Sequence, residues 1–353
     1  MSGLEIGGHR VGSGHPVFIV MEVGQAHDGS LGTAHAFIDL AADLGADAIK
    51  FQTHIASAES TSQEPFRVKF SRQDSSRYAY WQRMEFTLRQ WQELAAHAGE
   101  QQLVFLSSPF SVEAVELLEE CKVPAWKLGS GEIMNTLLFE RILQTGKPVL
   151  LSSGMSNWQE LDAATAMIKA TKVPLMLYQC TSKYPCPPEE IGLGVIAEMQ
   201  ERYQVPIGLS DHSGSSYFGI AAAALGVASV EVHMTLSRYA FGPDVASSLD
   251  PDGLKQLVKG IRQVERAVQH RVGKDAMAEQ LSSMRTMFGR SIVARSDLKK
   301  GTVLTKEHLS VKKPAGGLPP SAMPQLIGKK LIRDLQKDTI LSMNDAVISS
   351  VSQ

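Results

Sequence analysis

The sequence predicts a (β/α)₈ TIM barrel followed by a small β-rich domain. Eight short apolar, β-rich runs alternate with helical patterns over about 270 residues, which is the repeat of such a barrel. After Gln269 the pattern changes to shorter strand-like runs separated by Pro/Gly-rich loops. A doubly wound open sheet is the structural alternative, but the number of strands and the length of the region favour the barrel.

The predicted strands are short runs rich in Val, Ile, Leu and Phe, bounded by Gly, Pro and Asp. They are 16–23, 47–52, 103–108, 125–130, 148–153, 174–180, 205–210 and 228–234. Strands this apolar are typical of a parallel sheet that is covered on both faces.

Helical patterns follow most of these strands. In 31–45, Ala34, Ile38 and Ala41 lie near one helical face, and in 111–121 a serine stands at the cap position. The helix predicted at 157–170 opens with Asn157 and carries Glu160 three residues later, which is the capping-box arrangement. Residues 54–90 form a long polar insertion, which on a barrel would lie at the catalytic mouth as a lid or binding loop.

The chain is therefore expected to have a barrel domain at 1–270, a linker at 271–287 and a small C-terminal domain at 288–353. Its 353 residues are 43% hydrophobic and 20% charged, and the formal net charge is −2. This balance gives no reason to expect a nucleic-acid or membrane partner, and no apolar run approaches the roughly 20 residues that span a bilayer. The first residues lack a signal-peptide pattern, and three unpatterned cysteines indicate reduced thiols, so a cytoplasmic location is expected.

Polar residues stand at or just beyond the carboxyl ends of the predicted strands, where barrels place their chemistry. They are Glu22, Lys50, Gln52, Ser108, Lys127, Ser130, Glu132, Ser152, Tyr184, Ser210, His212 and His233. Two lysines with several hydroxyls suit a phosphate or carboxylate. Two histidines on adjacent strands suit a divalent metal with open positions, and Glu22 and Glu132 are candidate acid/base or substrate-binding carboxylates.

Structural explanations compete with these functional ones. A single histidine that ends a strand is more often a hydrogen-bonded structural residue than a ligand, and Asp244 could be a loop or capping residue. Lys50 and Lys127 are harder to explain structurally, because an unpaired lysine inside an apolar strand is costly.

The order of the motifs resembles the sialic acid synthase family, which includes the legionaminate and pseudaminate synthases. The residues that carry the resemblance are EVGQAHDGS, KFQTH, LSSPFS, KLGSGEIMNTLLFERILQTGKPVLLSSGMS, TSKYPCPPEEIGL, IGLSDHSG, ALGVASVEVHMTL, GPDVASSLDPDGLKQLVKGIR and RSIVARSDLKKGTVLTKEHLSVKKP. They cover nearly the whole chain in order. The last segment resembles the antifreeze-like (SAF) domain, a β-clip fold, that closes these synthases.

The resemblance implies a condensation of phosphoenolpyruvate with the aldehyde of an N-acyl hexosamine and water, giving a nine-carbon 2-keto acid and phosphate. It implies a divalent metal, Mn²⁺ above all with Mg²⁺ or Co²⁺ as alternatives, on His212 and His233. It places phosphoenolpyruvate on Lys50, Ser108, Lys127, Ser130, Ser152, Tyr184 and Ser210. It assigns catalytic positions to Glu22, Glu132, His212 and His233, and the sugar to Gln52, Asp244 and Lys313.

The resemblance also implies a homodimer in which the C-terminal domain of one subunit covers the sugar site of the other. Two departures concern the sugar end of the site. Ala26 stands where many members have Asn, and Lys313 stands where the family often has an arginine that contacts the N-acyl group. Lysine cannot copy the planar fork of arginine, so the identity of the sugar stays open.

Two other functions remain open from the sequence. One is a different phosphoenolpyruvate-aldose condensing synthase, of the 3-deoxy-octulosonate phosphate type, which uses a barrel without the SAF domain. The other is a non-catalytic carbohydrate-binding scaffold. Retention of two lysines inside strands speaks against the scaffold, because a retired site has no physical need for them.

Overall fold

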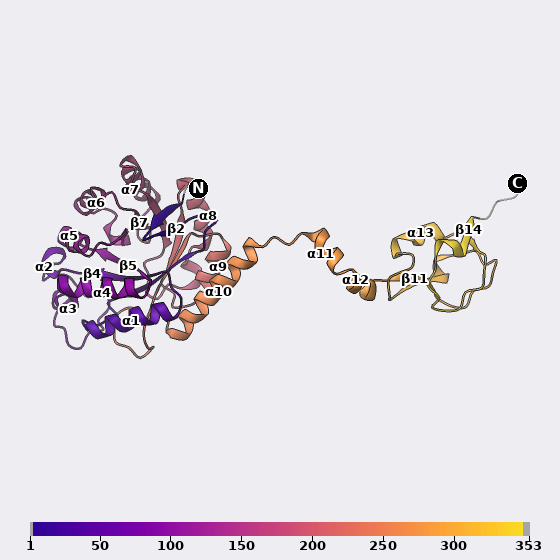
Figure 1. The fold of residues 1–353 in the computed structure, drawn as a ribbon, viewed down its shortest axis with the longest axis horizontal. Helices are drawn as coiled ribbons and strands as arrows, with labels where there is room; N and C mark the ends of the chain where they lie inside the picture. The colour runs from indigo at the N-terminus through magenta and orange to yellow at the C-terminus, as the bar shows by residue number, and fades with distance from the viewer. Residues whose placement is uncertain (1–2, 349–353) are drawn as a thin grey trace. The chain divides into compact units, whose positions relative to one another are not determined.

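The computed structural model describes residues 3–348 and divides into two compact units, Met1–Gln269 and His270–Gln353. The first is a parallel barrel surrounded by helices and the second is a small β-rich unit (Figure 1). The predicted fold class is confirmed. In the described part of the chain, no helix is long and apolar enough to cross a membrane.

All eight predicted barrel strands are present within a few residues of their expected limits. They are β3 (Phe18–Gly24), β4 (Ala48–Thr53), β5 (Val104–Pro109), β6 (Trp126–Leu128), β7 (Val149–Ser152), β8 (Leu175–Cys180), β9 (Ile207–Asp211) and β10 (Ser229–His233). They form one parallel sheet in the order β5-β4-β3-β10-β9-β8-β7-β6. The first strand of this set pairs with the last, β3 with β10, which curls the sheet into a nearly closed barrel.

Helices follow the strands and cover the outside of the barrel (Figure 1). They are α1 (Leu31–Asp43), α4 (Leu88–Glu100), α5 (Val112–Glu120), α6 (Thr136–Leu143), α7 (Trp158–Ala170), α8 (Leu193–Tyr203), α9 (Tyr217–Ala224) and α10 (Pro251–Gln269). The capping box predicted for α7 is confirmed, because Asn157 and Glu160 each bond the other's backbone N–H.

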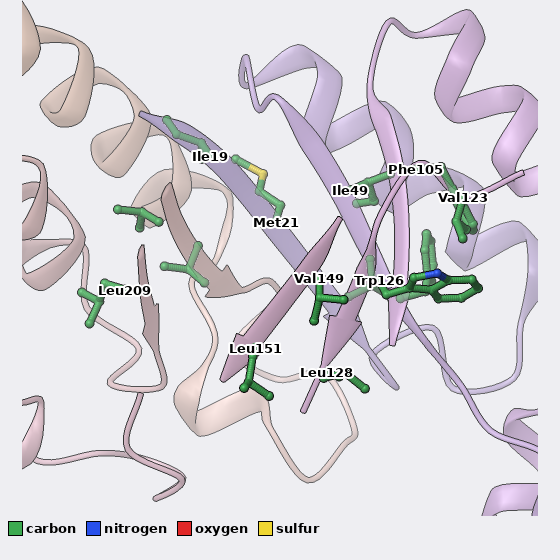
Figure 2. Close-up of a cluster of buried hydrophobic side chains, with 14 of the residues drawn as sticks. Ile19, Met21, Ile49, Phe105, Val123, Trp126, Leu128, Val149, Leu151 and Leu209 are labelled. Carbon is green, nitrogen blue, oxygen red and sulfur yellow. The ribbon is translucent and has the colours of Figure 1, made fainter. Parts of the chain in front are cut away.

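Side chains alternate between the two faces of each strand, which separates the core into two layers. Ile19 and Met21 of β3 point outward and join a large cluster under the helices, part of which Figure 2 shows. Phe18 and Val20 point inward and fill the barrel. The same alternation turns Glu22 inward at the carboxyl end of β3, so position on the strand decides whether a polar residue reaches the site.

A hairpin that the sequence analysis did not identify covers the amino-terminal end of the barrel. Its strands are β1 (Leu4–Ile6) and β2 (His9–Val11), joined by Gly7 and Gly8 with φ of +56° and +87°. These positive φ values suit the tight turn of a two-residue hairpin. Leu4, Ile6 and Val11 pack against the interior cluster, so the hairpin closes the end opposite the polar strand ends.

The 54–90 insertion has more regular structure than a loop. It contains α2 (Ala56–Glu59) and α3 (Arg77–Met84), and its last residues already belong to α4. Tyr80, Trp81 and Met84 of α3 form a small apolar core of their own with Ala56. Apolar contacts within the insertion therefore give it a defined shape.

The second unit begins with α11 (Lys274–Gln280) and α12 (Ser282–Phe288), so the segment predicted as a linker is helical over most of its length. Two antiparallel pairs follow, β11 (Ser291–Ala294) with β12 (Leu309–Lys312), and β13 (Lys329–Leu331) with β14 (Ala346–Ile348). A one-turn helix, α13 (Met323–Leu326), lies between the pairs, and a separate leucine-rich cluster forms the core. Residues 349–353 of the predicted C-terminal domain lie outside the described part.

Candidate active site

Strand alternation brings the predicted polar residues to one end of the barrel. Every second residue of a barrel strand points into the barrel. At this end the inward residues are Glu22 on β3, Lys50 on β4, Lys127 on β6, Ser210 on β9 and His233 on β10. All of these side chains are buried. The arrangement is a layer of charged and hydroxyl groups directly above the apolar filling of the barrel.

Two lysines and two glutamates form the centre of this layer. Lys50 Nζ lies 3.0 Å from Glu22 Oε2 and 3.2 Å from Glu231 Oε1. Lys127 Nζ lies 3.0 Å from the same Glu231 oxygen. Two cations and two carboxylates thus cancel formally inside the barrel, which is the condition under which charges can be buried.

The two carboxylates differ in how firmly they hold their charge. Burial raises the pKa of Glu22 to about 7, because the attraction of Lys50 does not offset the loss of water together with the repulsion of Glu231. Burial acts in the same direction on Glu231, but contacts with both lysines outweigh it and hold the pKa of Glu231 at about 2. Glu231 is therefore the fixed anion of the layer, and Glu22 is the carboxyl that can take up a proton near neutral pH.

The lysines differ in the same way. Burial lowers the pKa of each ammonium group, but in Lys50 the two carboxylates outweigh burial and the pKa is raised. Lys127 has one carboxylate neighbour and the repulsion of Lys50, so its pKa stays below the ordinary value. An added anion beside Lys127 would find the less well neutralised cation.

Hydroxyl groups surround the two ammonium groups. Lys127 Nζ donates to Ser152 Oγ at 2.8 Å, and Lys50 Nζ donates to Ser108 Oγ at 3.5 Å. Ser210 Oγ donates to Glu231 Oε1 at 3.1 Å. Cations with adjoining hydroxyl donors are the groups that a phosphate or carboxylate requires.

Ser130 belongs to the same region through the turn after β7. Its Oγ accepts from the backbone N–H of Gly154 at 2.9 Å. A Cβ atom on Gly154 would lie 2.7 Å from Ser130 Oγ and 2.4 Å from Ser182 Oγ, so only glycine lets the backbone approach this closely. Gly154 therefore brings the turn after β7 into direct contact with Ser130.

His212 and His233 lie side by side, with ring centroids 5.3 Å apart. The Nδ1 of His212 lies 3.0 Å from the Thr181 carbonyl oxygen, and its Nε2 lies 3.1 Å from the Tyr184 hydroxyl. A bond from Nδ1–H to a carbonyl leaves the lone pair on Nε2, the form in which imidazole binds metals. Burial lowers the pKa of His233 to about 3, so this ring is neutral. Burial also acts to lower the pKa of His212, but its contacts with Cys180 and the Thr181 carbonyl outweigh burial and the pKa is raised.

These two rings fit a divalent cation in part. Among residues 3–348, no three His, Cys, Asp or Glu side chains are grouped so as to hold a metal ion. Two imidazoles would supply only part of a coordination shell, and water and substrate would have to supply the rest. A metal bound in this way would keep open coordination positions for water and substrate.

A cavity of about 420 Å³ lies above the charged layer. Six of the residues predicted from the sequence line it, namely Gln52, Ser130, Glu132, Tyr184, His233 and Asp244. Aromatic side chains of the insertion form another wall, including Phe66, Tyr80 and Trp81. The combination of apolar rings with a few polar groups is typical of a small-molecule site.

Two acidic residues of the cavity have different surroundings. Glu132 is partly buried and accepts from Asn135 Nδ2 at 2.8 Å, and burial raises its pKa. Asp244 forms an ion pair with Arg67 of the insertion. The Arg67 guanidinium also lies over the Tyr184 ring, 4.2 Å from its centroid, so it joins the insertion to the loop after β10.

Glu231, Arg67 and Cys180 were missed by the sequence analysis. Glu231 had a usable signal, because it stands two positions before His233 on an apolar strand and therefore shares its inward face. Cys180 Sγ lies 3.8 Å from His212 Nδ1, a contact that residue spacing does not reveal. Arg67 lies 177 positions from Asp244 in the sequence, and nothing local predicts their pairing.

Lys313 is the one predicted site residue that belongs to the second unit. It follows β12, and its Nζ lies 4.9 Å from the centroid of the Phe288 ring. The barrel unit alone thus brings together the other predicted residues, and the role of Lys313 stays a prediction.

Comparison with known proteins gives matches over both units. Residues 37–273 match the NeuB family and residues 289–347 match the SAF domain. The chain is 32% identical over 329 residues to the N,N'-diacetyllegionaminic acid synthase of Campylobacter jejuni, covering 92% of this chain and 98% of that protein. It is 35% identical over 338 residues to the human N-acetylneuraminate-9-phosphate synthase, covering 94% and 93%.

A solved structure is similar as well. The N-acetylneuraminic acid (sialic acid) synthetase of Leptospira borgpetersenii, crystallised with citrate, matches with a TM-score of 0.70 and 29% identity. The match covers 80% of this chain and 96% of that structure.

Proposed function

The chain belongs to the NeuB family and carries a C-terminal SAF domain, and on this premise we propose that it is a sialic-acid-type synthase. The proposed reaction joins C3 of phosphoenolpyruvate to the aldehyde carbon of an N-acyl hexosamine. Water adds at C2, phosphate leaves, and a nine-carbon 2-keto acid results. Similarity to enzymes that make legionaminic and N-acetylneuraminic acid products supports this class of reaction.

The observation that carries the proposal is the pair of buried lysines, Lys50 within β4 and Lys127 within β6, in the charged layer. Phosphoenolpyruvate carries a phosphate and a carboxylate, and Lys50 and Lys127 with Ser108, Ser152 and Ser210 supply cations and donors for both. The lower pKa of Lys127 reflects incomplete neutralisation, which an anionic substrate would remedy. Ser130 and Tyr184 lie between this layer and the cavity and would complete the anion site.

We propose that His212 and His233 hold a divalent cation, with Mn²⁺ preferred on the family resemblance and Mg²⁺ or Co²⁺ as alternatives, since two imidazoles alone do not select Mn²⁺. Such a cation would polarise the acceptor aldehyde as a Lewis acid. The protein's part is to orient both imidazoles: burial keeps His233 neutral, and the contact with the Thr181 carbonyl fixes the orientation of the His212 ring.

Glu132 and Glu22 are proposed as the proton-handling carboxyls. Burial raises the pKa of both, and to about 7 for Glu22, so Glu22 can hold a proton near neutral pH and release it, and Glu132 holds a proton more readily than an exposed glutamate. Glu132 faces the cavity and is suited to the oxygen that develops negative charge on the acceptor. Glu22 lies below the cavity, hydrogen-bonded by Gln52 Nε2 at 2.9 Å.

The acceptor would occupy the cavity, with Gln52 and Asp244 as polar contacts. We propose a homodimer in which the second unit of one copy covers this cavity in the other and presents Lys313 to the sugar. Large apolar side chains at the mouth of the barrel support a covering partner, since Met134 is 68% exposed, Met155 64% and Tyr239 98%. Three free cysteines, all buried, support a cytoplasmic location.

The test is phosphate release from phosphoenolpyruvate with Mn²⁺, across N-acetylmannosamine, its 6-phosphate, diacetamido sugars and arabinose 5-phosphate. Release that requires one N-acyl sugar supports the proposal and names the acceptor. Release with arabinose 5-phosphate alone supports the octulosonate-type alternative. If no sugar gives phosphate release and the protein does not bind phosphoenolpyruvate in a separate binding assay, the carbohydrate-binding scaffold is the remaining alternative.

The metal proposal has its own test. His233→Ala should lose Mn²⁺ binding measured by calorimetry and most of the activity, while its circular dichroism spectrum stays that of the parent. Full activity of the parent enzyme in excess chelator would contradict the proposal.

A further inference from the structure

A row of five hydrogen-bonded side chains runs from the insertion to the charged layer. Glu59 Oε1 lies 2.5 Å from His54 Nδ1, and His54 Nε2 lies 2.7 Å from Gln25 Nε2. Gln25 Nε2 donates to Gln52 Oε1 at 2.6 Å, and Gln52 Nε2 donates to Glu22 Oε1 at 2.9 Å. The row connects α2, β4 and the loop after β3.

The chemistry of its ends fixes the direction of every bond in the row. The Glu22 carboxylate accepts, so Gln52 turns its nitrogen toward Glu22 and its oxygen toward Gln25. Gln25 then turns its nitrogen toward Gln52, and its second N–H points at His54 Nε2. His54 Nε2 lies 2.7 Å from Gln25 Nε2, a donor, and 3.3 Å from Gln52 Oε1, an acceptor. The shorter contact makes Nε2 the acceptor and places the proton on Nδ1, where Glu59 accepts it.

Packing holds the His54 ring in place for this role. The ring is sandwiched between Trp81, with centroids 3.9 Å apart and planes at 14°, and Phe110, with centroids 4.4 Å apart and planes at 9°. The His54 and Glu59 side chains are only 4% and 8% exposed. The ring therefore cannot turn over without opening the stack, and Glu59 selects the tautomer of a ring whose orientation is already set.

The consequence concerns the free end of Gln25. Both N–H groups of its amide are used within the row, and no residue of the described part of the chain donates a hydrogen bond to its Oε1. Gln25 lines the cavity. Its carbonyl oxygen is thus the group left to meet a hydrogen-bond donor on a bound molecule.

We propose that Gln25 is a specificity residue that accepts an O–H or acylamino N–H of the acceptor sugar, and that Glu59 and His54 are positioning residues that keep its carbonyl toward the cavity. The inference rests on the proposed function for the identity of the bound sugar. The KFQTH segment and the insertion would then together fix which end of the Gln25 amide, the oxygen or the nitrogen, faces the cavity.

The first experiment reads the tautomer directly and needs no turnover. NMR of the full-length protein with isotope-labelled histidine should show His54 as neutral with its proton on Nδ1, the signal being assigned by its loss in His54→Gln. Glu59→Gln should shift this signal toward a mixture of tautomers, because a carboxamide can donate to or accept from Nδ1. An Nε2–H or doubly protonated His54 in the parent protein would overturn the proposal.

The second experiment measures steady-state kinetics with the acceptor identified by the phosphate-release panel. Glu59→Gln and Gln25→Met should each raise the acceptor KM roughly tenfold and leave the phosphoenolpyruvate KM unchanged, as expected for one lost hydrogen bond to a buried group. Glu93→Gln on the exposed face of α4 is the matched control. Unchanged acceptor KM values, or equal rises in both KM values, would overturn the recognition role even if the NMR result holds. A parent enzyme that releases no phosphate would instead contradict the proposed function.

Discussion

At the scale of single residues, the site depends on charges that are buried but paired. Glu231 Oε1 accepts from Lys127 and Ser210 and lies within 3.2 Å of Lys50, so one oxygen atom holds the layer together. Such a group costs little when it is fully paired and a great deal when one partner is removed. The functional layer and the stability of the barrel are therefore coupled through this side chain.

We expect Glu231→Gln to lower the free energy of unfolding by about 3 kcal/mol, because it leaves two buried ammonium groups with one carboxylate. Phosphoenolpyruvate should stabilise this variant more than it stabilises the parent, since the ligand restores the missing negative charge. Urea unfolding with and without ligand measures both effects, with Glu116→Gln on the exposed side of α5 as the control. Equal stability of variant and parent without ligand would contradict this account.

His27 provides a pH-dependent prediction away from the charged layer. Its ring is buried against Phe86, its Nδ1 accepts from the Gly29 N–H at 3.1 Å, and its Nε2 has no hydrogen-bond partner within the described residues. Burial lowers the pKa of His27 to about 3, against an ordinary value of 6.5. The neutral ring therefore stabilises the fold fully above pH 6.5, and this contribution is lost as the pH falls from 6.5 toward 3.

His233 has the same direction of shift, so the two histidines together contribute a slope near two protons, while Glu22, with its raised pKa, contributes in the opposite direction in both proteins. His27→Asn keeps an acceptor for Gly29 and removes one titrating group, so the slope should fall by about one proton, or roughly 1.4 kcal/mol per pH unit. Urea unfolding at several pH values between about 4 and 6 measures it. Identical slopes in the two proteins would show that His27 is not buried as described.

At the scale of elements, the 54–90 insertion determines the upper half of the site. The barrel strands supply the charged layer, but the aromatic wall, Arg67, His54 and Glu59 come from the insertion or its first residues. Arg83 of α3 anchors it to the loop after β3 by an ion pair with Asp28, and a second pair with Asp74 lies within the insertion itself. Its own core and these ion pairs give it enough order to shape a binding site.

Arg67→Ala should therefore weaken acceptor binding more than phosphoenolpyruvate binding. The change removes the partner of Asp244 and the cation over the Tyr184 ring, and we expect a rise of about threefold to tenfold in the acceptor KM. The exposed Arg89→Ala on α4 is the matched control. If the KM values of both substrates rose equally, Arg67 would act on the charged layer that binds phosphoenolpyruvate and not on the acceptor alone.

At the scale of the whole molecule, two independently packed units share one proposed function. The barrel unit contains the charged layer, the histidine pair and the cavity, and the second unit has its own leucine-rich core. Lys313 is the predicted site residue of the second unit, and its ammonium group lies beside the Phe288 ring, with no carboxylate of the described residues paired to it. Its proposed role toward the sugar can therefore be tested by substitution without breaking an ion pair among these residues.

Lys313→Arg should change the acceptor KM by at least about threefold and leave the phosphoenolpyruvate KM unchanged, because a planar fork and a point charge bind an acyl oxygen differently. Lys312→Arg, one residue earlier and paired with Asp338, is the control. Steady-state kinetics measure both variants, and sedimentation tests the expected homodimer. Equal effects of the two substitutions would remove Lys313 from the sugar site.

The sequence determined the strands, their order and the residues at their ends. Apolar runs and caps are local signals, so the barrel strands and the α7 capping box could be identified from them, and the strand-end rule selected Lys50, Lys127, His212 and His233 together. The β1–β2 hairpin was missed because runs of three residues are too short to show a period. The insertion was underestimated because its helices are short and its composition is polar.

Only the tertiary structure decided how these residues meet. The pairing of β3 with β4 places Glu22 beside Lys50, and closure of β3 on β10 brings Glu231 between both lysines, which fixes which carboxyl is ionised and which can hold a proton. The tertiary fold also sets Arg67 against Asp244 and aligns the row from Glu59 to Glu22 across α2, β4 and the end of β3. Periodicity along one strand reports which face a side chain takes, but hydrogen bonds between strands depend on register and curvature, which belong to the barrel as a whole.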